Sequence, residues 1–119
     1  MIWVSRISWV KLSTVSDDDP LYRGTLFRFK RVGRKDEIVD WMLFATWQGS
    51  GLGLVRDSGH DAGIVSVVLP IEAKVEGEVA ISPTWLCRHW QEWIDSRSAA
   101  GSVWVLRDGR GEPDKLPDE

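Results

Sequence analysis

Cys87 and His89 lie two positions apart in the segment TWLCRHWQEW (84–93), and a thiol beside an imidazole can bind zinc or support nucleophilic catalysis. Ser82 and Pro83 precede this segment with the residue types of a helix N-cap and first helical position, so the segment is predicted to be helical. Side chains two positions apart on a helix point about 200° from one another and cannot hold the same ion. The chain has a single cysteine and no H-x-x-x-H pair to complete a zinc site. Both residues are therefore predicted to be structural, and no metal or cofactor is expected.

The same segment predicts an amphipathic helix from Pro83 to about Ser96. Its polar residues face away from an apolar stripe whose members recur at offsets of four, seven and eight. Trp90 and Trp93 are expected in the core, and Trp85 is expected to be half exposed on the flank. The stripe consists of Leu86, Trp90, Trp93 and Ile94.

His60 and Asp61 lie in a glycine-flanked segment, SGHDAG (58–63), that is predicted to be the tip of a β-hairpin. Asp57 and Ser58 are nearby, so a base, an acid and a hydroxyl are close in sequence. Such tips carry catalytic residues in some proteins and are solvated turns in others. A catalytic triad needs residues that converge from separate segments. A small enzyme that uses the tip at 57–61 stays an alternative, although the chain is predicted not to be an enzyme.

The segment RGTLFRFKR (23–31) resembles part of an RNA-recognition motif but fails at four of its specified positions. Its basic residues are predicted to line a solvated edge strand, because lysine-rich edges prevent association between sheets. A nucleic-acid-binding module that uses the basic run 23–35 is a second alternative. The run contains Arg23, Arg28, Lys30, Arg31, Arg34 and Lys35.

The segment DDDP (17–20) places three consecutive carboxylates in a predicted loop. This loop either serves solubility or offers a negative contact patch to a basic partner, where carboxylates speed association and set specificity.

Alternating apolar and polar residues predict a mainly β chain around the helix. An unbroken apolar row at period two, from Val39 through Trp41 to Trp47, indicates a central strand. The segment 71–80 favours neither helix nor strand. Strands are predicted at 1–12 (with Ile7 and Trp9 on one face), 23–30, 38–47, 52–57, 63–69 and 103–107.

We therefore expect an α+β fold, with an antiparallel sheet of about five or six strands and one main helix packed on one face. Residues 1–107 are predicted to form a single domain, and 108–119 a flexible polar tail. A lone cysteine, the absence of a signal-type core and of a membrane-spanning run, and a net charge of −3 together predict a cytoplasmic protein. That charge disfavours general binding to nucleic acid or to membranes.

Several segments, in this order, resemble a family of small bacterial immunity proteins encoded beside polymorphic or contact-delivered toxins, the type known as immunity protein 45. The resemblance implies a non-catalytic inhibitor that binds one cognate toxin or effector. It supplies no fixed site residues. The segments are PLYRGTLFRF (20–29), DWML (40–43), GIVSVVLP (63–70), ISPTWLCRHWQEWI (81–94) and VWVL (103–106).

The toxin-binding surface is accordingly predicted from charge and side-chain type. Acidic loops suit a nuclease-like toxin with a basic cleft, and a half-exposed tryptophan beside arginine is typical of binding hot spots. No nucleic acid or membrane is expected as a partner. The predicted surface comprises Asp17, Asp18, Asp19, Asp57, His60 and Asp61, with Trp85, Arg88 and Glu92 as additional candidates.

Overall fold

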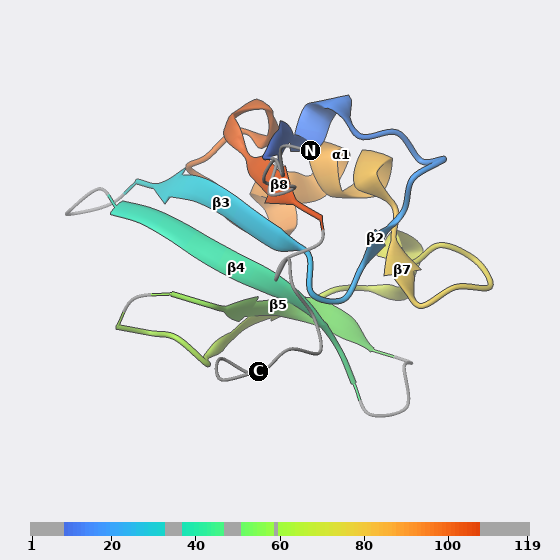
Figure 1. Cartoon of the computed structure of the whole chain (residues 1–119), viewed down its shortest axis with the longest axis horizontal. Coiled ribbons are helices and arrows are strands. Elements are labelled where there is room, and N and C mark those ends of the chain that lie inside the picture. The colour runs from blue at the N-terminus through green and yellow to red at the C-terminus, as the bar shows by residue number, and fades with distance from the viewer. Residues whose placement is uncertain (1–8, 33–36, 47–50, 59, 108–119) are drawn as a thin grey trace, which may run out of the picture.

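The computed structural model describes residues 9–32, 37–46, 51–58 and 60–107, which form an α+β fold (Figure 1). A six-stranded antiparallel sheet has the order β1-β8-β3-β4-β5-β6, and a second sheet pairs β2 with β7. This confirms the predicted fold class and adds the small second sheet. The strands are β1 (Val10–Lys11), β2 (Leu21–Tyr22), β3 (Leu26–Arg31), β4 (Glu37–Ala45), β5 (Leu52–Arg56), β6 (Val65–Val68), β7 (Ala80–Ile81) and β8 (Trp104–Leu106). The helices are α1 (Pro83–Trp93) and three short 3-10 helices, η1 (Leu12–Thr14), η2 (Ile71–Ala73) and η3 (Ala100–Ser102).

Strand β4 is central, as its alternation predicts. It pairs with β3 on one side and with β5 on the other. Val39, Trp41 and Leu43 are buried on the face that packs against α1. Because both edges of β4 are paired, its apolar row is enclosed by neighbouring side chains.

Strand β3 lies inside the sheet, and the prediction that the basic run forms an edge strand is wrong. Strand β8 pairs with β3 along the edge opposite β4, with Phe27 opposite Val105. The segment 103–107 therefore returns from the far end of the chain to cover an edge that the local pattern leaves open. Sequence charge alone does not reveal such a long-range partner.

Helix α1 begins as predicted, because the Ser82 hydroxyl accepts a hydrogen bond from the backbone N–H of Trp85 at 3.1 Å. It ends at Trp93, about one turn earlier than the predicted end at Ser96. The backbone N–H of Asp95 still reaches the carbonyl of Trp90, but the Asp95 carboxylate accepts a bond from the N–H of Arg97. An aspartate that bonds the backbone two residues ahead favours a turn over another helical turn.

The core lies between α1 and the sheet. Trp90 is fully buried, and its ring contacts Phe29 edge-on at 5.2 Å. Phe29 in turn contacts Trp41 at 5.0 Å in the same geometry. The burial of Trp90 is as predicted, whereas the prediction that Trp93 is a core residue is wrong: Trp93 is 38% exposed. Trp93 is the last residue of the helix, where the chain turns away and no strand covers the ring.

Several predictions fall outside the described residues. Within the described residues, no helix is long and apolar enough to cross a membrane. The predictions outside them concern Ile7, Arg34, Lys35, Trp47 and the polar tail 108–119.

Candidate functional site

The acidic loop lies against the N-terminus of α1, and one of its carboxylates is an integral part of that helix start. Asp17 Oδ1 accepts hydrogen bonds from the Ser82 hydroxyl at 2.8 Å and from the backbone N–H of Thr84 at 2.9 Å. The bond from the Thr84 N–H, followed by those from Ser82 and by nearby Arg88, holds the pKa of Asp17 below its ordinary value. Asp17 is therefore a helix cap.

Asp19 is also engaged within the chain. Arg107 Nη2 lies 2.5 Å from Asp19 Oδ1, and the same guanidinium donates to the backbone carbonyls of Asp19 and Pro20 at 3.1 Å each. Arg107 follows β8, so this contact ties the loop to the end of the sheet. All three predicted aspartates of the loop are exposed, and the Asp19 side chain keeps 63% of its surface accessible beside Arg107.

The hairpin tip forms one wall of a surface hollow of about 240 Å³. Arg56 is one of its lining residues and donates to Asp61 Oδ2 at 2.7 Å and to the Ser66 hydroxyl at 3.0 Å. The Arg56 guanidinium also lies 5.6 Å from the centre of the Trp41 ring. The hollow is lined by Arg31, Glu37, Ile38, Val39, Trp41, Arg56, Ser58, His60 and Asp61.

This geometry changes the interpretation of the tip. Asp61 faces the Arg56 cation, so it neither orients the exposed His60 for base catalysis nor adds to a negative surface. Asp57 is half-buried, and its backbone N–H donates to the carbonyl of Asp40 at 2.8 Å. One of the two carboxylates predicted for binding at the tip, that of Asp61, is therefore neutralised within the chain by Arg56.

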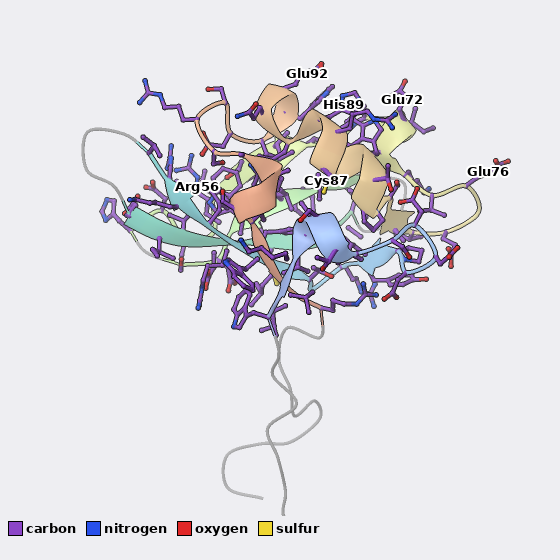
Figure 2. All side chains as sticks on the ribbon, turned by 90° about the horizontal axis from the view of Figure 1, so that it is seen from above. Arg56, Glu72, Glu76, Cys87, His89 and Glu92 are labelled. Atoms are coloured by element: carbon purple, nitrogen blue, oxygen red, sulfur yellow. The ribbon has the colours of Figure 1, made fainter. Side chains whose placement is uncertain are left out.

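The side of α1 that carries His89 and Glu92 (Figure 2) also carries aromatic rings in contact with one another. Trp85 stacks on His89 with ring centres 4.5 Å apart, and it lies 6.1 Å from Trp93. His89 Nδ1 is 3.2 Å from Glu92 Oε1, and Arg88 is exposed beside them. Trp85 is half-buried against the core, as predicted for the flank of the helix.

Cys87 and His89 do not face a common point. Cys87 is half-buried, and burial raises the pKa of its thiol, which disfavours the reactive thiolate. Within the described part of the chain, no three His, Cys, Asp or Glu side chains are grouped to hold a metal ion.

The predicted surface residues form two separate groups. The acidic loop and the outer face of α1 adjoin one another, since Asp17 bonds Thr84 of the helix. The β5–β6 hairpin tip lies at the opposite end of the sheet from that loop (Figure 1). One partner surface would have to span the molecule to contact both groups.

Arg28 belongs to the basic run considered above, but the sequence did not predict the cluster that it forms with Asp40 and Trp9. The Arg28 guanidinium makes a two-pronged ion pair with Asp40, at 2.7 and 2.9 Å, and stacks 4.3 Å over the ring of Trp9. The first cause of the raised pKa of Arg28 is the hydrogen bond to Asp40. The alternation in residues 23–30 and 38–47 placed Arg28 and Asp40 on the faces opposite the core. It could not show that the two strands pair in the register that joins them.

The comparisons with known proteins give one match. The family model for immunity protein 45 matches residues 13–105, which is most of the chain. No curated protein and no solved structure matches.

Proposed function

The chain belongs to the immunity protein 45 family, and from that membership we propose that it binds a cognate bacterial toxin and neutralises it without catalysis. The family match over residues 13–105 is the observation that carries the proposal. It covers every described strand from β2 to β7, helix α1 and most of β8, so it rests on the whole scaffold and not on one motif.

The structure supports a binding role through rigidity. Trp90, Phe29 and Trp41 form a continuous chain of edge-on aromatic contacts between helix and sheet. A scaffold that is ordered before binding loses little conformational entropy in the complex, so more of the contact energy appears as affinity.

The hairpin tip gives no support to an enzymatic role. Its carboxylate at Asp61 is paired with Arg56, and His60 is exposed to solvent. We therefore propose inhibition by occupancy: the protein acts in the cytoplasm by staying bound to the toxin.

The test is to coexpress the chain with the toxin domain encoded by the neighbouring reading frame in a susceptible bacterial host. We expect growth to be restored and the two proteins to purify as a complex. Continued growth arrest with abundant, folded immunity chain would contradict the proposal.

A titration in vitro separates binding from catalysis. Adding increasing amounts of the chain to a fixed amount of active toxin should remove toxin activity in proportion to the molar ratio. If a small fraction of an equivalent inactivates all the toxin over time, the chain acts catalytically, and the proposed mode of inhibition is wrong.

A further inference from the structure

The face of the main sheet opposite α1 is built differently from the surfaces considered so far. Figure 2 shows α1, with Cys87, His89 and Glu92 labelled, on one side of the sheet. Because side chains alternate along a strand, Arg28, Asp40 and the residues in register with them point to the other side of the sheet. We call this side the open face. Its residues are Trp9, Lys11, Arg28, Lys30, Ile38, Asp40, Met42, Phe44, Val55, Val65, Val68 and Trp104, together with Leu26 and Leu106, which are buried at 7% exposure each.

One half of the open face is apolar, and a β-bulge enlarges it. In the β5–β6 ladder, Val55 pairs with Val65 and Gly53 with Val68, so Ser66 is the extra residue of the bulge. The bulge turns both Val65 and Val68 to the open face, where Val65 is 53% exposed and Val68 is 59% exposed. Ile38, on β4, is 68% exposed on the same face.

The other half combines tryptophans with cations. Lys11 Nζ lies 4.7 Å over the ring of Trp104 and donates to the carbonyl of Gly101 at 3.0 Å. Beside it, Arg28 lies between the Trp9 ring and Asp40. These contacts fix long side chains in advance, which lowers the entropy lost on binding.

The charge of the open face differs in sign from that of the chain. Among the residues named above, Lys11, Arg28 and Lys30 are cations and Asp40 is an anion, whereas the whole chain has a net charge of −3. A partner that complements this face needs an apolar centre edged with carboxylates.

We propose that the open face is the surface that binds the toxin, through an acidic, apolar-centred patch of the toxin and not through a basic substrate cleft. This inference rests on the proposed function and names its surface. Exposed valines and isoleucine suit the dry centre of a protein interface, whereas nucleic acid would require phosphate contacts along the face. The Arg28 guanidinium is already held by Asp40, so the structure favours a protein partner.

Two tryptophans of almost equal exposure give a matched test. Trp104 is 40% exposed on the open face, and Trp93 is 38% exposed at the end of α1 on the other side. We expect Trp104→Ala to weaken binding to the neighbouring toxin domain by about tenfold or more, as for a hot-spot tryptophan. Trp93→Ala should change it by less than about twofold, with both dissociation constants measured by calorimetry and folding checked by thermal unfolding.

A charge reversal gives an independent measurement. Lys30→Glu, on the exposed part of the face, should slow association with the toxin and reduce the dependence of the association rate on salt. Arg97→Glu, the same reversal at an exposed position beyond the end of α1, should leave both quantities unchanged.

The outcomes separate this inference from the proposed function. If the unmodified chain binds and neutralises the toxin but Trp93→Ala is the damaging variant, the open-face proposal is wrong and the function stands. If the unmodified chain does not bind the toxin, the proposed function itself fails. A third outcome is that Trp104→Ala leaves toxin binding unchanged and instead abolishes either the binding of a single-stranded uridine oligonucleotide or the dimerisation of the chain. In either case the face serves that other partner and the proposal is overturned.

Discussion

At the residue scale, Trp90 links the helix to the sheet and also satisfies its own polar atom. Its indole Nε1 donates to the hydroxyl of buried Ser98 at 2.9 Å. A buried indole N–H without an acceptor would reduce stability, so Ser98 makes the burial of Trp90 favourable. The apolar stripe predicted that Trp90 is buried, but Ser98 lies beyond the helix, and its role follows only from the tertiary structure.

We predict that Trp90→Ala lowers the free energy of unfolding by about 3–5 kcal/mol through loss of contacts and formation of a cavity. Ser98→Ala should cost about 1–3 kcal/mol, because it leaves the indole N–H unpaired. Urea unfolding followed by circular dichroism measures both. Trp93→Ala is the matched control, and a loss there as large as that of Trp90→Ala would contradict the assignment of the core.

Asp17 provides a prediction about pH. Its folded-state pKa is lowered, first of all by the Thr84 N–H, so its carboxylate contributes stability above its ordinary pKa. That contribution is lost as the pH falls through the lowered value. Asp17→Asn keeps an oxygen acceptor without the charge and should flatten the fall in stability as the pH drops below the ordinary pKa of an aspartate.

The size of the capping effect is tested separately. Asp17→Ala removes the acceptor for both Ser82 and Thr84 and should cost about 0.5–2 kcal/mol at neutral pH, the range for a lost helix cap. Thermal unfolding across pH measures both variants. An acid limb for Asp17→Asn as steep as that of the unmodified chain would exclude a lowered pKa at this position.

At the scale of elements, the β5–β6 hairpin depends on the absence of a side chain at Gly53. A Cβ atom at Gly53 would lie 2.3 Å from the carbonyl oxygen of Val67 and 2.7 Å from the Phe44 ring. The first atom belongs to the backbone of the paired strand and cannot move without breaking the ladder. The close approach lets Phe44 cover the strand on the open face.

Gly53→Ala is therefore expected to destabilise the protein by more than about 2 kcal/mol, as do other changes that overfill a packed position. Hydrogen exchange should show that the amides of β5 and β6 lose protection first. Gly101→Ala is the control, because nothing lies within 4 Å of a Cβ atom there. Equal stability of the two variants would show that the strands can separate without cost.

Element boundaries were predictable where a local signal exists. Ser82 and Pro83 fixed the start of α1, and alternation fixed β4 and the β5–β6 pair. The end of α1 was wrong by about one turn because the Asp95 side chain competes for the backbone, and apolar periodicity does not register that competition. The bulge at Ser66 could not be predicted from the sequence either, since it depends on the register between β6 and β5.

At the scale of the molecule, the two ends of the described chain meet in the sheet. Strand β1 pairs with β8, and β8 pairs with β3, so β8 closes the sheet between two segments from the first third of the chain. Arg107, which follows β8, forms an ion pair with Asp19 of the acidic loop. The fold therefore requires the chain through Arg107.

A chain truncated after Arg107 should fold with a Tm within about 2 °C of the full chain, as the predicted domain 1–107 implies. A chain that stops at Gly101 loses β8 and leaves the edge of β3 opposite β4 unpaired, and it should not unfold cooperatively. Scanning calorimetry of the two truncated chains is the measurement. Loss of folding on removal of 108–119 alone would show that the domain extends beyond Arg107.

The class of fold, the central strand, the start of the helix, the burial of Trp90 and the resemblance that the family match confirms could all be predicted from the sequence. Each depends on a local pattern or on segments in a fixed order. The contacts of Asp17 and Asp19 within the chain, and the position of the basic strand inside the sheet with Arg28 against Asp40, became known from the folded structure. Periodicity shows which side of an element is apolar. The pairing of distant strands decides which charged residues meet, and so which of them remain available to a partner.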